Sequence, residues 1–202
     1  MKLNYKALLF VLLFAVKSYA QNRVGNGGDV VTCKDKSPQV LDLYESSAEI
    51  ITPAETDYQK IVSERLDLLA EAQGKLADQY RIKFSGFLND SEFKATAKLT
   101  DIKDSEHLVL PKGCRLKQAA IRKNATAKNE KLFLFDNDNW QEMDSLNKAA
   151  LIMHEIIYDH FYKLGERNSI KARKVNALLF SKNFSKKQFW ELIQDLKIPI
   201  YP

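Results

Sequence analysis

Cysteine and histidine are scarce in this chain of 202 residues, which has two cysteines and three histidines. Neither cysteine has a second cysteine or a histidine at the spacing of a zinc-binding motif. Beyond the first twenty residues, no apolar run is long enough to cross a membrane. Internal repeats and low-complexity linkers are also lacking. These absences argue against zinc binding by the cysteines, an integral membrane protein and a repeat architecture.

The first twenty residues are typical of a secretory signal peptide. Lys2 and Lys6 precede an apolar run over 7–16, and the sequence Ser-Tyr-Ala ends at Ala20. We expect cleavage after Ala20, an exported protein that is periplasmic or extracellular, and a single domain over 21–202. Cleavage would remove three lysines and lower the net charge from +5 to +2. The basic composition is therefore weak evidence for nucleic acid, which we do not expect as a partner.

Cys33 and Cys114 both lie in the part of the chain that is expected to be exported. An even number of cysteines in an oxidising compartment favours a disulfide, and two buried free thiols are the alternative. The bond would close a loop of about eighty residues and contribute roughly 4 kcal/mol in the chain-entropy model. We therefore expect a disulfide that joins the start of the exported chain to its middle.

The pattern of apolar residues predicts an α+β domain. Helices are expected at 39–49, 57–88, 144–165, 170–180 and after Ser185. Strands are expected at 30–32, 93–102, 116–122 and 131–135. A polar loop separates the last two strands, which predicts a hairpin. The expected architecture is a small, mostly antiparallel sheet packed against a buried central helix and flanking helices.

The central helix is predicted by the stretch DSLNKAALIMHEIIYDHFYKLG, which runs from Asp144 to Gly165. Asp144 or the serine after it can cap the first turn, and Gly165 can end the helix in a left-handed conformation. The middle of this stretch is apolar nearly all round, which is typical of a helix buried on most sides. His154 and Glu155 lie within it, and their burial costs several kcal/mol unless they are paired or hydrogen-bonded. The two side chains therefore need partners from the protein or from a ligand.

A zinc peptidase is one interpretation of His154 and Glu155. Peptidases of the zincin type have two histidines four residues apart, with a glutamate after the first. Here Tyr158 occupies the second position, and His160 points to another face of the helix. The motif therefore lacks a required ligand. A metal could still bind through His154 and carboxylates such as Asp29, although the sequence indicates no particular cofactor.

Two other interpretations need no metal. A glutamate in apolar surroundings has a raised pKa and can act as a general acid, and Glu155 with Asp29 nearby would match the carboxyl pair of a glycosidase. Alternatively, Glu155 pairs with Arg167 or Arg173 while His154 bonds a backbone carbonyl, and the two groups are structural. Two functions stay open: a hydrolase that acts on envelope polymer or peptide, and a non-catalytic envelope or partner-binding protein.

The glycine-rich start of the exported chain, GNGGD at 25–29, is expected to lie against His154, Glu155 and Tyr158. Glycines lack a Cβ and permit close approach of the backbone. Their N–H groups can satisfy Glu155, while Asp29 accepts a hydrogen bond from His154 or Tyr158. The predicted catalytic residues are therefore Glu155, His154, Asp29 and Tyr158.

The segment 163–187 has eight Lys or Arg residues and one acid, Glu166. Such a surface would suit an anionic partner, which could be an envelope polymer or protein, lipid headgroups or nucleic acid. No nucleic-acid-binding motif and no interleaved aromatic residues accompany the charge, so a solvated face is the preferred interpretation.

Several stretches of the chain form a recognisable set. They are GNGGDVVTC at 25–33, LDLYE at 41–45, LPKGCRLKQAAI at 110–121, KAALIMHEIIY at 148–158 and NSIKARKVNALLFS at 168–181. In this order they resemble a family of exported proteins from predatory bacteria of the Bdellovibrio kind. The resemblance implies export and such a source, and its HExxY-like string implies that Tyr158 belongs with His154 and Glu155. It implies no particular reaction.

Overall fold

The structure is a computed structural model that describes residues 28–97, 99, 108–124 and 129–201. The expected signal peptide, glycines 25 and 27 and most of the second half of the expected strand 93–102 lie outside these residues. Within the described part, no helix combines the length and the hydropathy that a membrane span requires.

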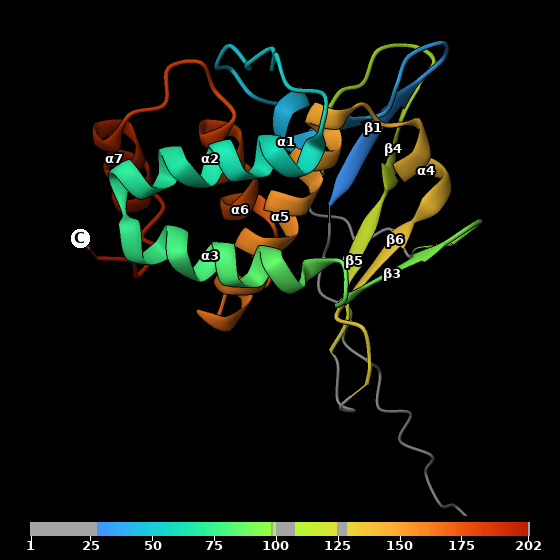
Figure 1. The fold of residues 1–202 in the computed structure, drawn as a ribbon. Helices are drawn as coiled ribbons and strands as arrows, with labels where there is room; N and C mark the ends of the chain where they lie inside the picture. Colours follow the sequence, from blue (N-terminus) through green and yellow to red (C-terminus); the bar gives the residue numbers. More distant parts are fainter. Residues whose placement is uncertain (1–27, 98, 100–107, 125–128, 202) are drawn as a thin grey trace, which may run out of the picture.

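The described chain is an α+β domain, as predicted, with most of its helices on one side and its strands, together with α4, on the other (Figure 1). The strands are β1 (Asp29–Cys33), β2 (Gln39–Val40), β3 (Ser91–Lys94), β4 (Cys114–Gln118), β5 (Ala120–Arg122) and β6 (Phe133–Asp136). The helices are α1 (Leu41–Tyr44), α2 (Tyr58–Ala72), α3 (Gly74–Phe87), α4 (Asn137–Glu142), α5 (Ser145–Lys163), α6 (Ile170–Leu179) and α7 (Lys186–Asp195).

The described strands form two small sheets rather than the single sheet expected, with strand orders β2-β1-β4 and β3-β6-β5. All pairs are antiparallel except β3 with β6, which is parallel. The predicted hairpin is confirmed by β5 and β6, but the predicted strand 116–122 is divided between the two sheets. Its division falls at Ala119, whose N–H donates to Gly28 O at 2.9 Å and whose carbonyl accepts from Asp136 N at 2.8 Å. Ala119 therefore bonds to both sides of the junction between the sheets.

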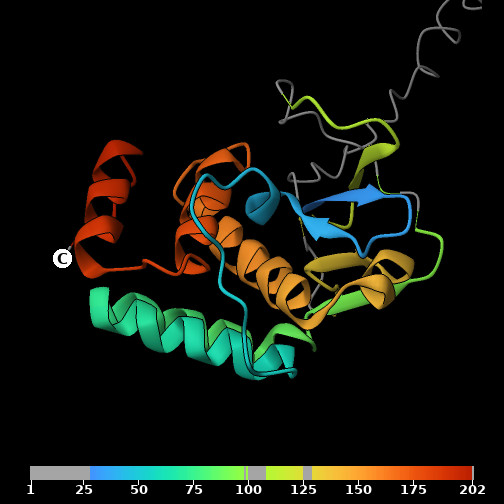
Figure 2. The ribbon, with the colours of Figure 1, turned by 90° about the horizontal axis from the view of Figure 1, so that it is seen from above.

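Helix α5 is the central helix that the sequence predicts. Residues 149–159 are all buried, and α5 contacts α1, α2, α3, α6, β2 and β5 (Figures 1 and 2). Asp144 caps it by accepting a hydrogen bond from Asn147 N at 2.8 Å. At its other end Gly165 has φ +103, and the N–H groups of Gly165 and Glu166 donate back into the last turn, which is a Schellman ending.

The single helix predicted over 57–88 is wrong, because the chain forms two helices, α2 and α3, that pack against each other. The break is at Gln73, which has the extended angles φ −150 and ψ 92. An unbroken helix of that length would measure about 48 Å, whereas a hairpin lets both apolar faces reach the core. The helix expected at 39–49 is likewise reduced to the one turn of α1, which follows directly on β2.

Candidate functional site

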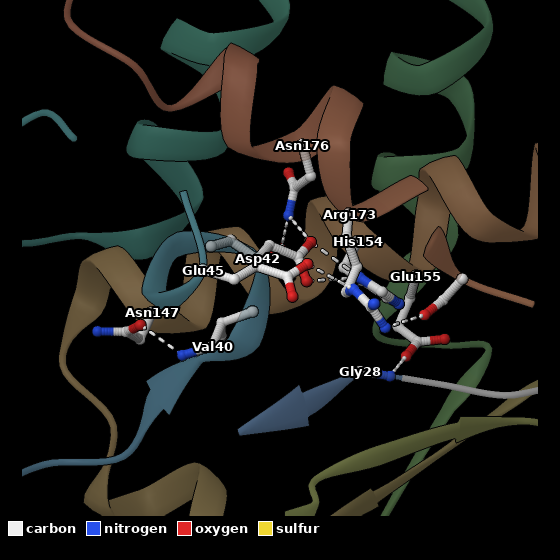
Figure 3. Close-up of polar contacts among 11 residues, drawn as sticks. Gly28, Val40, Asp42, Glu45, Asn147, His154, Glu155, Arg173 and Asn176 are labelled. Carbon is white, nitrogen blue, oxygen red and sulfur yellow. Dashed lines mark hydrogen bonds and ion pairs between the residues drawn. The ribbon is translucent and has the colours of Figure 1, made fainter. Parts of the chain in front are cut away.

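His154 lies on the side of α5 that faces α1 and α6. Its Nδ1 is 2.8 Å from Oδ2 and 3.1 Å from Oδ1 of Asp42. Asn176 donates from Nδ2 to Oδ2 of Asp42 at 2.7 Å and to Ala150 O at 2.9 Å. In Figure 3 the dashed lines run from Asp42 to both His154 and Asn176. The partner of His154 is therefore a carboxylate of α1, not the backbone carbonyl or the Asp29 that the sequence suggested.

The first turn of α5 fixes the position of Asp42. Asn147 accepts a hydrogen bond from Val40 N at 2.8 Å, and it is itself held by Asp144, which accepts from its Nδ2 at 2.9 Å. Val40 immediately precedes α1, so this contact places Asp42 two residues further on, within reach of His154. A helix of one turn has little stability of its own, and its place here depends on such tertiary bonds.

Glu155, the next residue of α5, faces the start of β1 instead. Gly28 N–H donates to Oε1 of Glu155 at 2.7 Å. A Cβ at Gly28 would stand 2.1 Å from Cδ1 of Leu151 and 3.4 Å from Oε1 of Glu155, so a larger residue would have to displace the side chain of Leu151. The prediction that the glycine-rich start reaches Glu155 is confirmed at Gly28, where the described chain begins.

Asp29 and Tyr158, the other two predicted site residues, are also buried, with exposed fractions of 2% and 0%. Asp29 begins β1 opposite Gln118 of β4 and follows directly on Gly28. The ring of Tyr158 lies 6.2 Å from that of His154, measured between centroids. The structure thus gathers the predicted residues around the middle of α5 and the start of β1, but Nδ1 of His154 is bonded to Asp42.

Burial and charge shift the pKa values of the two central groups. Burial by itself lowers the pKa of His154, but the charge of Asp42 and the hydrogen bond to it outweigh this, and the pKa rises to about 9. Burial raises the pKa of Glu155 to about 7 against the opposing effects of His154 and of the Gly28 N–H. At neutral pH His154 is therefore a cation beside the carboxyl group of Asp42, and Glu155 holds a proton more readily than an exposed glutamate does.

One polar atom of each central side chain has no hydrogen-bond partner among the described residues. These atoms are Nε2 of His154 and Oε2 of Glu155, and both side chains are 0% exposed. Buried polar groups in folded proteins are nearly always bonded, so two such atoms on consecutive residues form an unusual feature. In chemical terms, one is a proton donor on a cation and the other an oxygen of a carboxyl with a raised pKa.

The arginines that were expected to neutralise Glu155 have other partners. Arg173 donates from Nε to Oε1 of Glu45 at 2.7 Å. The guanidinium of Arg167 lies 5.2 Å from the ring centre of Tyr162. The predicted pairing of Glu155 with Arg167 or Arg173 is therefore wrong. The group that bonds Glu155 is instead the backbone N–H of Gly28.

Asp42 and Asn176 are the site residues that the sequence analysis missed. Asp42 stands between Leu41 and Leu43, and all three residues are buried. Asn176 is 0% exposed within α6. Both lie in stretches of the resembling set, LDLYE and NSIKARKVNALLFS. The sequence indicates these two residues only as polar residues within apolar stretches. Such a pattern does not identify their hydrogen-bond partners.

No metal-binding cluster is assembled in the described part of the chain. No group of three or more His, Cys, Asp or Glu side chains is arranged there to hold a metal ion. The metal site considered from the sequence, His154 with carboxylates such as Asp29, is therefore not formed among these residues.

A cleft of about 500 Å³ opens beside this buried network, between α1, α6 and α7. Glu45, Arg173 and Lys174 line it with charged side chains, and the fully buried Asp42 belongs to its inner wall. Its apolar lining comes from Ala48, Ile170, Ala177, Leu178 and Leu192. Asp42 belongs both to the lining and to the bonded pair with His154, so the pair supports the inner wall of the cleft.

Comparison of the chain with protein-family models, with curated proteins and with solved structures gives no match. The function is therefore inferred from the geometry of the site alone.

Proposed function

We propose that this chain is an exported envelope protein that binds a ligand in the cleft between α1, α6 and α7 without catalysing a reaction. The observation that carries the proposal is the double role of Asp42. Asp42 belongs to the inner wall of the cleft although its side chain is fully buried, and His154 and Asn176 hold its carboxylate in place. A binding site requires such a wall to be rigid before the ligand arrives, because ordering it on binding would cost affinity.

Burial favours binding over catalysis. A general acid or base must come within hydrogen-bond reach of the substrate, directly or through one water. His154, Glu155 and Tyr158 are each 0% exposed, and none of them lines the cleft. The groups that a ligand in the cleft would meet are instead the ion pair of Arg173 with Glu45, the amine of Lys174 and the apolar lining.

The lining of the cleft indicates the class of ligand. Its volume of about 500 Å³ suits a small molecule or a short peptide segment. Apolar side chains form much of it, and Lys174 makes no ion pair with another described residue. A short envelope-derived peptide with a small apolar side chain and a free carboxylate would satisfy both features, since its carboxylate could pair with Lys174.

The test is binding of peptidoglycan peptide fragments to the chain over 21–202, measured by calorimetry and by thermal unfolding. A ligand at 100 times its Kd should stabilise the folded protein by about 2.7 kcal/mol. Ala177→Trp should abolish this effect by filling the cleft. Ile82→Trp is the matched control, because Ile82 is 74% exposed on α3 and lies outside the cleft. If the Ala177→Trp variant still binds the fragments, the ligand does not bind in this cleft and the proposal is wrong.

A hydrolase is the second candidate, and the unbonded atoms of His154 and Glu155 favour it. Perturbed pKa values next to unsatisfied buried atoms are characteristic of acid–base sites. Turnover of the same fragments would decide the matter. If wild type cleaves them and Glu155→Gln loses cleavage while melting at an unchanged temperature, the site is catalytic and the non-catalytic proposal is overturned. Binding without turnover supports the proposal.

A further inference from the structure

A second cleft, of about 410 Å³, lies beside the sheet β2-β1-β4 and is separate from the site described above. The disulfide Cys33–Cys114 forms part of its wall. This bond confirms the pairing expected from the sequence and joins the end of β1 to the start of β4. The other lining residues are Val31, Lys34, Lys36, Ser37, Gln39, Tyr44, Pro111, Lys112 and Gly113.

The charge of this cleft is of one sign. Lys34, Lys36 and Lys112 line it, and no carboxylate does. None of the three lysines forms an ion pair with any other described residue. Asp35 lies between two of them in the sequence, but it is exposed and does not contribute to the lining. The cleft therefore concentrates positive charge that nearby acids in the described chain do not neutralise.

The basic segment 163–187 shows the opposite arrangement. Five of its eight cations are paired with carboxylates, in the pairs Lys163–Asp159, Lys171–Glu166, Arg173–Glu45, Lys182–Glu49 and Lys187–Glu191. An ion pair leaves little net field for a partner to recognise. The sequence suggested an anionic partner for segment 163–187. The lysines of the second cleft, unpaired among the described residues, suit such a partner better.

The walls of the second cleft are held in place by turns at the two cysteines. Lys36 N–H donates to Cys33 O at 3.4 Å, and Cys114 N–H donates to Pro111 O at 3.0 Å. Gly113 adopts φ +86, which lets the second turn close. The disulfide ties both turns together, so the backbone that carries the lysines is held in place before a ligand binds.

We propose that this disulfide-walled cleft binds a ligand with several oxyanion groups. Lysine amines are point charges that suit phosphate and carboxylate oxygens. Ser37, Gln39 and Tyr44 add hydroxyl and amide groups that can donate hydrogen bonds to the same oxygens. The multiple charges of such a ligand match the three lysines, and a neutral ligand would leave them without partners. The site does not depend on the peptide-binding cleft proposed above.

The test is calorimetric titration of the chain over 21–202 with inorganic tripolyphosphate and with citrate at constant ionic strength. We expect saturable binding to one site. Tighter binding of tripolyphosphate would indicate a phosphate-bearing ligand, and tighter binding of citrate a carboxylate-bearing one. Replacing Lys34, Lys36 and Lys112 together by Gln should weaken binding at least roughly tenfold, since three charge contacts are lost.

The control replaces Lys75, Lys186 and Lys197 together by Gln. These lysines are exposed, lie outside the cleft and form no ion pair with a described residue, so the change in net charge is the same. The control should bind within about twofold of wild type, because distant exposed charges are screened. The proposal is overturned if wild type binds neither probe, if the cleft variant keeps its affinity, or if the control loses as much as the cleft variant.

Discussion

Asp42 and Asp159 are both fully buried carboxylates, yet the protein neutralises them in different ways. Among the described residues Asp42 has one charged partner, His154, which is itself 0% exposed. Asp159 lies on α5 and receives three cations, Arg122 at 2.9 Å, Lys163 at 2.9 Å and Lys83. Around Asp42 the charges are balanced one to one and sealed from water. Around Asp159 positive charge is in excess, and two of the cations reach solvent.

This difference determines how each carboxylate responds to loss of a partner. The side chains of Lys83 and Lys163 are 31% and 56% exposed, so water can replace either of them. Burial and the nearby charge of Lys163 lower the pKa of Lys83 to about 8, which reflects the crowding of cations there. Asp42 has no second cation or exposed partner that water could replace, among the described residues. It is buried between α1, α5 and α6. We therefore expect Asp159, which has three cationic partners, to tolerate the loss of one of them. Asp42 should not tolerate the loss of His154.

The largest effect is expected for His154→Gln. Glutamine can still donate a hydrogen bond to Asp42, but it leaves that carboxylate buried without an opposite charge. Breaking a buried ion pair in this way should lower the free energy of unfolding by about 3–5 kcal/mol. Urea unfolding of the chain over 21–202 measures the change. Adding Asp42→Asn should recover part of the loss, and a double variant that is as unstable as the sum of the singles would contradict the pairing.

An intermediate effect on the free energy of unfolding is expected when the pH is raised. It arises from the pair of His154 with Asp42. The pKa of His154 is raised from 6.5 to about 9, so the folded state holds a proton that the unfolded state releases. The resulting stability is fully present below pH 6.5 and is lost as pH rises through about 9, with a magnitude on the order of 3 kcal/mol. The measurement is the difference in unfolding free energy between wild type and His154→Gln across this range. A difference that does not change with pH would contradict the prediction that Asp42 raises the pKa of His154.

The smallest effect is expected for Lys163→Ala. Asp159 keeps Arg122 and Lys83 as partners, and Lys163 is more than half exposed in its side chain. The variant should lose less than about 1 kcal/mol, as is usual for an exposed ion pair. The same urea experiment measures it. A loss close to that of His154→Gln would mean that the three cations act as one indivisible unit and would break the comparison.

The helix α5 could be predicted from sequence because its signals are local. Asp144, Gly165 and the apolar residues between them indicate its start, end and burial within one continuous stretch. The disulfide was also predictable, since a chain with two cysteines allows only one intramolecular pairing. The division of 57–88 into α2 and α3 had only a weak local signal, Gly74 beside the break, because the helical pattern of apolar residues continues across Gln73.

For the site, the sequence by itself determined that His154 and Glu155 would be buried and would need partners, and that a glycine could let the backbone approach. Only the tertiary structure decided what those partners are. Gly28 is 127 residues from Glu155, Asp42 is 112 from His154, and Asn176 is 134 from Asp42. Nothing in a local pattern distinguishes Asp42 from Asp29, or the N–H of Gly28 from the guanidinium of Arg173, as the group that meets α5. That choice depends on which elements pack on which face of the helix, and consecutive residues about 100° apart around the helix face different neighbours.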